Sequence, residues 1–152
     1  MSHVTAVGFE TDVLRDKAEA LALKLNLQVD NQVLPRLCVT VSKLVLLTAH
    51  FTPLYVDFNT DHCQKRRDAG KQGLIRACGP KKGIRIIDAT AGWGRDALLL
   101  ASFGAEVCMI ERQPMVATLL ADGLERLDDG TPVQAWNKWG ESPLIPIVYS
   151  GI

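Results

Sequence analysis

The sequence carries no excess of charge of either sign. Its 152 residues include 17 basic and 17 acidic side chains, which excludes a uniformly basic nucleic-acid coat protein but leaves room for a local basic patch. Aromatic residues are scarce, at 6%. The hydrophobic share of 47% and the charged share of 22% are typical of a globular chain and exclude wholesale disorder. At this length we expect one domain, or one domain with a small appendage.

Closely spaced cysteine and histidine residues are also missing. Neighbouring cysteines lie at least 15 residues apart, and the three histidines are scattered. Zinc sites and redox motifs normally bring two such residues within a few positions of each other. We therefore predict no metal site, and reduced thiols in a cytosolic protein. The four cysteines are Cys38, Cys63, Cys78 and Cys108.

The sequence shows neither a long hydrophobic run nor a targeting signal. The most apolar stretch, residues 37–51, is interrupted by polar side chains and is shorter than the roughly 20 apolar residues of a membrane helix. The first residues lack the basic-then-apolar order of a signal peptide. These features predict a soluble, cytoplasmic protein.

The first part of the chain predicts a small α+β region. A helix is expected to open at Asp16, which can cap it together with Glu19, and to stop near residues 26–30. β-Branched and apolar residues predict one strand over 37–47 and a second over 54–58. We expect these two strands to pair antiparallel.

From Gly83 onward the pattern alternates between strand and helix. The connections are short, and this order is the βαβ arrangement of a parallel sheet. The predicted elements are a strand over 84–87, a helix over 95–103, a strand over 106–110 and a helix over 115–127.

The segment from residue 62 to residue 85 concentrates positive charge. It holds eight basic residues against one acidic residue, a local charge of +7 that the rest of the chain must balance. Such asymmetry indicates a surface for an anionic partner, and a solvated linker is the alternative. The basic residues are Lys65, Arg66, Arg67, Lys71, Arg76, Lys81, Lys82 and Arg85.

A tight glycine turn joins the strand that ends at Asp88 to the helix that follows. Gly92 and Gly94 let the backbone turn sharply and let a ligand approach closely. Glu111 lies 23 residues after Asp88, at the end of the next strand, where a carboxylate can accept hydrogen bonds from both hydroxyls of a ribose. This order is typical of α/β sheets that hold an adenosine-containing cofactor.

Two cofactor classes fit this turn. The spacing Gly92-x-Gly94-x-x-Ala97 matches the dinucleotide pattern, but the strand of dinucleotide enzymes runs directly into the first glycine. Here Asp88 ends the strand, and Asp-x-x-x-Gly-x-Gly is the order found in S-adenosylmethionine methyltransferases. A carboxylate suits the charged amino-acid end of that cofactor and would repel a pyrophosphate. We favour methyl transfer over hydride transfer, and an unliganded α/β domain is the third alternative.

Four longer runs of sequence are more specific. Through them the chain resembles the ribosomal RNA small subunit methyltransferase J family, firmly over about residues 56–127 and more loosely upstream. The resemblance implies a Rossmann-like class I fold and S-adenosylmethionine as cofactor. It also implies methylation of the exocyclic N2 of one guanosine in 16S ribosomal RNA. The four runs are GLIRACGPKKG at 73–83, DATAGWGRDA at 88–97, MIERQP at 109–114 and LLADGL at 119–124.

The resemblance also implies roles for individual residues. Cofactor contacts fall on Arg95 and Asp96 after the turn, and on Glu111 and Arg112 after the second strand. We assign no catalytic base, because the cofactor carries the activated methyl group. Together with the turn itself, the candidate cofactor-binding residues are Asp88, Gly92, Gly94, Arg95, Asp96, Glu111 and Arg112.

The same resemblance implies an RNA partner for the basic segment. Arg76, Lys81 and Lys82 are candidate contacts to the phosphates of 16S ribosomal RNA or the small ribosomal subunit. Such contacts give a salt-sensitive binding contribution that does not depend on base sequence.

The chain departs from the family after residue 127. Family members are longer and carry an Asp-Pro-x-x-Pro loop, whereas this sequence has no Asp-Pro dipeptide. Residues 128–152 do not align, and they can supply one more strand over 145–149, interrupted by Pro146. A sheet of about seven strands does not fit in this length.

We therefore expect the N-terminal portion of a Rossmann-like class I methyltransferase sheet, truncated at its C-terminus and preceded by a small α+β region. A non-catalytic RNA- or cofactor-binding remnant is the main alternative. An NAD-dependent oxidoreductase is less favoured, because no hydride-transfer residues are recognisable. The predicted parts are an N-terminal region over 1–60, a basic RNA-facing linker over 61–83, a partial cofactor domain over 84–127 and a divergent tail over 128–152.

Overall fold

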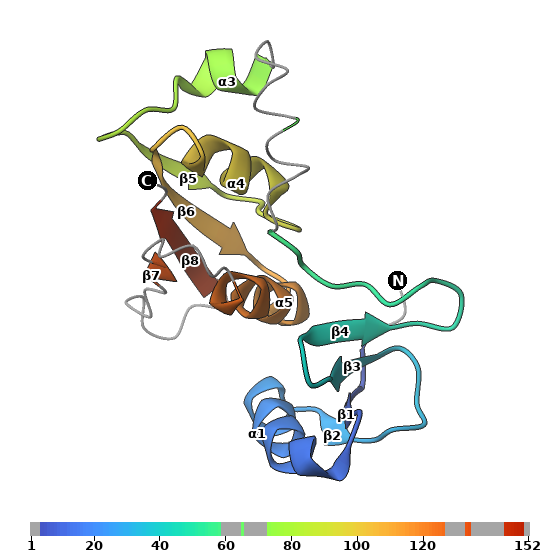
Figure 1. The fold of residues 1–152 in the computed structure, drawn as a ribbon. Coiled ribbons are helices and arrows are strands. Elements are labelled where there is room, and N and C mark those ends of the chain that lie inside the picture. The colour runs from blue at the N-terminus through green and yellow to red at the C-terminus, as the bar shows by residue number, and fades with distance from the viewer. Residues whose placement is uncertain (1–3, 59–64, 66–72, 127–132, 135–144, 151–152) are drawn as a thin grey trace. The chain divides into compact units, whose positions relative to one another are not determined.

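The chain forms two compact units, residues 1–55 and residues 56–152. A computed structural model describes residues 4–58, 65, 73–126, 133–134 and 145–150 (Figure 1). Within these ranges no helix is long and apolar enough to cross a membrane. The predicted boundaries near residues 60, 83 and 127 stay predictions.

The N-terminal unit is a four-stranded sheet with one helix. Its strand order is β2-β1-β3-β4. The central strand β1 runs parallel to β2 and β3, and β3 pairs antiparallel with β4. The elements are β1 (Ala6–Phe9), a 3₁₀ turn η1 (Asp12–Leu14), α1 (Arg15–Leu25), β2 (Gln28–Val29), β3 (Arg36–Val39) and β4 (Leu44–Leu47).

The core of this unit lies between α1 and the sheet. Ala18 and Ala22 are the buried residues of the helix. The sheet contributes Val7 and Leu37, both fully buried. Small side chains on the helix let it pack closely on larger aliphatic residues of the strands.

The predicted N-terminal helix is confirmed in place but not in its cap. The helix begins at Arg15 after Leu14, which makes no side-chain capping bond, and Asp16 lies in its first turn. The expectation that Asp16 caps the helix was therefore wrong. The helix ends at Asn26, whose left-handed backbone with φ of 55° closes the last turn, within the predicted range.

The single strand expected over 37–47 is two strands joined by a tight turn. The Thr40 hydroxyl accepts hydrogen bonds from the backbone N–H of Lys43 at 3.1 Å and of Ser42 at 3.3 Å. It also donates to the Lys43 carbonyl at 2.7 Å. A threonine that binds its own backbone in this way favours a turn over a continuous strand.

The strand expected over 54–58 was also wrong. Of these residues only Leu54 pairs, in an isolated antiparallel bridge with Leu46 of β4. The expected antiparallel pairing of 37–47 with 54–58 is thus reduced to this one bridge. The main antiparallel pairing of the N-terminal unit is between β3 and β4.

The C-terminal unit has the predicted alternation of strands and helices. Its sheet has the order β5-β6-β8-β7, with β5 and β6 parallel (Figure 1). Both α4 and α5 contact β6 and β8. The elements are α3 (Gly73–Cys78), β5 (Arg85–Asp88), α4 (Arg95–Ala101), β6 (Glu106–Glu111), α5 (Pro114–Glu125), β7 (Val133–Gln134) and β8 (Ile145–Ser150).

Alternation along β6 decides which face of this sheet forms the core. Val107 and Met109 are buried, and they lie on the face that α4 and α5 cover. On the opposite face Cys108 is half-buried, and its neighbour Ile87 on β5 is 68% exposed. The helices of the unit supply the rest of the core, above all Leu99, Leu100, Leu119, Leu120 and Leu124.

The tail contributes a strand, as predicted, but an antiparallel one. β8 pairs with β6 along its whole length, from Ile145 opposite Glu111 to Ser150 opposite Glu106. On its other edge β8 pairs with β7 only at Val148 and Tyr149. Pro146 has no backbone N–H to donate. No described residue pairs with it on the β7 edge of β8, so no hydrogen bond is lost on that edge.

Candidate functional site

The glycine turn follows directly from the carboxyl end of β5. Gly92 and Gly94 both have positive φ, at 52° and 70°, which a residue with a Cβ rarely adopts. The Ala91 N–H donates to the Ile110 carbonyl at 3.1 Å, so the turn is tied to the end of β6. The turn closes where the Gly94 N–H donates to the Ala91 carbonyl at 2.8 Å, immediately before α4.

Glu111 fixes the turn from the neighbouring strand. Its Oε2 accepts a hydrogen bond from the Gly92 N–H at 3.0 Å, and its Oε1 accepts one from the Gln113 N–H at 2.8 Å. The carboxylate is half-buried and held in one orientation by these two backbone donors. Each carboxylate oxygen has more than one acceptor direction, so hydroxyl donors of a ligand can still bind.

Asp88 stands at the other side of the turn. It ends β5 and is half-buried, and its Oδ1 accepts a hydrogen bond from the Thr90 N–H at 3.2 Å. Two acidic residues thus flank one glycine turn at the carboxyl ends of two adjacent parallel strands. In open α/β sheets this edge is where ligands bind.

A cavity of about 510 Å³ opens beside β5. This volume lies in the range of pockets that enclose a cofactor-sized ligand. Its wall combines aliphatic side chains with charged and aromatic residues of the turn and of α4. The lining residues are Leu74, Cys78, Ile86, Ile87, Asp88, Thr90, Ala91, Trp93, Arg95, Asp96 and Leu100.

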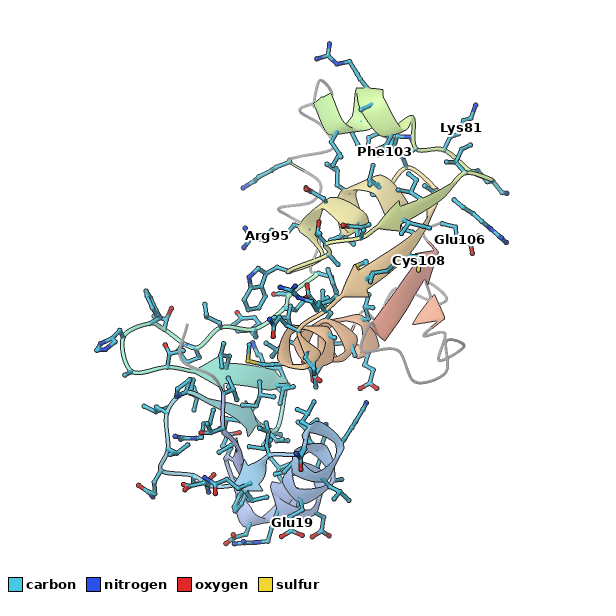
Figure 2. All side chains as sticks on the ribbon, turned by 180° about the vertical axis from the view of Figure 1, so that it is seen from behind. Glu19, Lys81, Arg95, Phe103, Glu106 and Cys108 are labelled. Carbon is cyan, nitrogen blue, oxygen red and sulfur yellow. The ribbon has the colours of Figure 1, made fainter. Side chains whose placement is uncertain are left out.

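The predicted cofactor residues divide into two groups. Asp88, Arg95 and Asp96 line the cavity, and Figure 2 shows Arg95 at the start of α4. The other predicted residues lie in or behind the turn and do not line the cavity. These are Gly92, Gly94, Glu111 and Arg112.

The predicted RNA contacts are exposed, and none of them lines the cavity. Arg76 is on α3, and Lys81 and Lys82 are in the connection before β5. Figure 2 shows Lys81 and Arg95 at opposite ends of β5. The structure therefore does not bring the two lysines together with the glycine turn. Most of the remaining basic segment, residues 62–64 and 66–72, lies outside the described residues.

Sequence reasoning missed the wall that α3 forms. Leu74 and Cys78 of this helix line the cavity. The helix was not predicted, because the charged residues around it show no clear helical period. Trp93 was also missed as a lining residue. Its position between Gly92 and Gly94 was the available signal, since a large side chain there must flank any ligand of the turn.

The thiols suit a structural role better than a nucleophilic one. Burial raises the pKa of Cys38, which is buried in β3, and the pKa of Cys108 in β6. A raised pKa keeps these thiols protonated and slow to react. Cys38, Cys78 and Cys108 are free thiols, and Cys63 lies outside the described residues. Among the described residues no three potential ligands gather as a metal ion would require.

Comparison with known protein families places most of this chain in one family. The model of the family described as "Putative SAM-dependent methyltransferase" matches residues 20–140. The chain belongs to this family. The glycine turn and most of the preceding α+β region fall within the match, and the predicted α/β, Rossmann-like fold class is confirmed.

Two curated relatives of this chain carry the same name. A protein named Ribosomal RNA small subunit methyltransferase J from Legionella pneumophila (strain Corby) is 52% identical over 130 residues, covering 85% of this chain and 54% of the relative. The protein of the same name from Thioalkalivibrio sulfidiphilus is 40% identical over 132 residues, covering 80% and 52%. The resemblance found in the sequence is confirmed. The chain spans about half the length of these relatives.

A solved structure shares the fold. The SAM-dependent methyltransferase from Neisseria gonorrhoeae superposes with a TM-score of 0.59 at 28% identity, covering 80% of this chain and 52% of that one. The match supports a common fold over the aligned parts of these two chains.

Proposed function

We propose that this chain is the cofactor-binding part of an S-adenosylmethionine-dependent methyltransferase that acts on the exocyclic N2 of a guanosine in 16S ribosomal RNA in the cytoplasm. One observation carries the proposal. Asp88 and Glu111 end adjacent parallel strands and flank a glycine turn beside a cavity of about 510 Å³. The family match and the names of the relatives support the substrate class.

The donor set suits this cofactor better than a dinucleotide. S-adenosylmethionine carries an ammonium and a sulfonium and lacks a pyrophosphate. A cavity with Asp88 and Asp96 in its wall favours such a cationic group and disfavours a pyrophosphate. In the same wall, the Arg95 guanidinium suits the cofactor's carboxylate.

Each residue of the site has a proposed task. Glu111 holds the ribose hydroxyls while its backbone donors keep the carboxylate in place. Asp88 faces the amino-acid end of the cofactor. Gly92 and Gly94 allow the backbone to approach the ligand, and Arg112, which follows Glu111 in the chain, is a further proposed cofactor contact.

For this reaction the main task of the protein is to position the cofactor and the substrate. The bound cofactor supplies an activated methyl group. The residues of the turn and of α4 hold and orient it, and the cavity wall of Leu74, Ile86 and Leu100 excludes water from one side. No catalytic base is assigned.

The basic residues before β5 are proposed to bind RNA phosphates. Arg76, Lys81 and Lys82 are exposed, so an RNA backbone can reach them. Lys81 lies at the opposite end of β5 from Arg95 (Figure 2), which favours a role in orienting the RNA over a part in the methyl transfer.

Calorimetric titration of the 152-residue chain with S-adenosylhomocysteine tests the proposal. We expect micromolar binding of this product and no binding of NADH at the same concentrations. A folded chain that binds neither compound would contradict the cofactor site. A chain that binds NADH instead would revive the oxidoreductase alternative.

A second candidate is cofactor binding without methyl transfer. It is favoured by the absence from this sequence of the Asp-Pro dipeptide that the family resemblance leads us to expect. A radiolabelled methyl-transfer assay on unmethylated small-subunit RNA separates the two candidates. Label in the RNA supports the methyltransferase, whereas binding of the cofactor without label in the RNA supports the second candidate.

A further inference from the structure

Residues Val56–Phe58 form a short segment that packs against Gly94 of the glycine turn and against α5. No strand or helix includes these residues, yet Val56 is only 2% exposed and Phe58 only 3%. Both belong to the same compact unit as the turn. Such deep burial of irregular backbone needs a specific partner surface.

The first partner surface is a glycine inside α5. A Cβ built on Gly123 would lie 2.6 Å from Cγ1 of Val56 and 3.2 Å from Cε2 of Phe58. Glycine is unfavourable within a helix, so a helical glycine usually marks a close approach. Here the space that Gly123 leaves is filled by the two apolar side chains.

The second partner surface is the turn itself. A Cβ on Gly94 would lie 2.9 Å from both Cε1 and Cζ of Phe58 and 2.9 Å from Cδ2 of Leu120. The edge of the Phe58 ring therefore rests against the backbone of Gly94, between it and α5. Gly94 is also the residue at the N-terminal cap of α4.

A pair of polar contacts fixes the other end of the segment. The Arg126 guanidinium donates a hydrogen bond to the Val56 carbonyl, and its Nε pairs with Oδ2 of Asp122 at 2.9 Å. Both charged side chains are largely buried, which reduces screening by solvent. The segment is thus held at Val56 by α5 and presents Phe58 to the turn.

We propose that Phe58 is a positioning residue for the cofactor site and acts through Gly94. The two neighbours of Gly94 in the chain, Trp93 and Arg95, line the cavity, whereas Phe58 does not. Because the Phe58 ring fixes the position of the Gly94 backbone, it also fixes the positions of Trp93 and Arg95. This inference rests on the proposed function, since it concerns the same site.

Trp93 provides a direct optical readout of this effect. The chain has three tryptophans, and replacing Trp136 and Trp139 by Phe leaves Trp93 as the sole emitter. In this background we compare Phe58→Leu with Phe51→Leu, a matched change at a ring that is 72% exposed. Phe58→Leu is expected to shift Trp93 emission and raise its quenching by acrylamide, and Phe51→Leu to change neither.

Affinity for S-adenosylhomocysteine gives the second readout. Phe58→Leu is expected to weaken binding about tenfold or more, because small displacements of positioning groups are costly at a preorganised site. Val107→Ala serves as a control for lost stability, since Val107 is buried in the same sheet. It should lower the urea midpoint while the folded protein keeps its affinity.

A rescue pair keeps the inference testable if Phe58→Leu fails to fold. Gly123→Ala places a methyl group against Val56, and we expect it to weaken binding and shift Trp93 emission. Adding Val56→Ala removes Cγ1, the nearest atom at 2.6 Å, and should restore both in part, because the Val56 Cβ at 3.0 Å remains. Unchanged Trp93 emission and affinity in a folded Phe58→Leu variant, or in Gly123→Ala, would overturn the inference. Absence of binding in the parent chain would instead contradict the proposed function, and the ligand-free Trp93 signal would still decide the role of Phe58.

Discussion

At the scale of single residues, Glu111 combines two tasks in one carboxylate. It anchors the Gly92 backbone and is proposed to hold the ribose. Glu111→Ala is expected to weaken binding of S-adenosylhomocysteine by about 1–3 kcal/mol, because charge-assisted hydrogen bonds to a carboxylate contribute in this range. Titration calorimetry measures the change.

A matched control lies on the same strand. Glu106 pairs with Arg85 at 3.1 Å at the opposite end of β6. Glu106→Ala removes an acidic residue of the same type away from the turn, so it should leave the affinity unchanged. Equal losses in the two variants would remove the specific role of Glu111.

Asp30 gives a prediction about pH. Its Oδ1 accepts hydrogen bonds from the backbone N–H of Gln32 at 2.6 Å and of Val33 at 3.2 Å, and these donors lower the pKa of the carboxyl below its ordinary value of 3.8. The carboxylate therefore stabilises the folded state above about pH 3.8, and this contribution is lost as the pH falls through the lower folded value. NMR titration of the Asp30 carboxyl should give a pKa below 3.8. A value at or above 3.8 would show that the turn does not hold the carboxylate.

At the scale of elements, the connection before β5 carries the proposed RNA contacts. Replacing Lys81 and Lys82 by Ala is expected to lower the affinity for small-subunit RNA. It should also reduce the slope of the salt dependence by about 1 for each phosphate that no longer pairs with a lysine. Filter binding at several salt concentrations measures both quantities.

The control for this pair comes from α1. Lys17 and Lys24 are exposed on that helix, and their replacement by Ala removes the same charge from the chain. This variant should keep the salt slope of the parent. If it changed the slope as much as the lysine pair before β5, the binding would depend only on net charge.

The elements around the glycine turn could be predicted because several signals agreed there. β5, α4, β6 and α5 lie within a few residues of the predicted ranges, since glycines, an early proline and apolar runs all mark the same boundaries. β1 was missed because four residues rich in small side chains carry little periodicity. β3 and β4 were merged because strand propensity does not register the hydrogen bonds of Thr40.

The site was predicted in its sequence order but not in its walls. The acid, the two glycines and the second acid follow one another along the chain, so spacing alone placed them at one sheet edge. Leu74 of α3 comes to the cavity from a segment with no such pattern. Phe58 contacts the turn from 36 positions before Gly94. Contacts of this kind depend on tertiary packing, which single-sequence patterns do not encode.

At the scale of the whole molecule, α4 and α5 cover one face of the sheet in the C-terminal unit. α4 and α5 bury Val107 and Met109, while Ile87 on the other face stays 68% exposed. Parallel strands normally have both faces covered. Most of the buried apolar contact that stabilises this unit therefore lies between the sheet and the two helices.

This asymmetry predicts very different costs for two aliphatic truncations. Leu119 of α5 is fully buried, so Leu119→Ala should lower the free energy of unfolding by about 2–5 kcal/mol through lost burial and a cavity. Ile87→Ala should cost below about 1 kcal/mol, because most of that side chain already contacts solvent. Urea unfolding followed by Trp93 fluorescence in the background without Trp136 and Trp139 compares the two. A loss at Ile87 as large as that at Leu119 would mean that the outer face of the sheet is covered in solution, by another copy of the chain or by part of the chain itself, and the concentration dependence of the midpoint would distinguish these two arrangements.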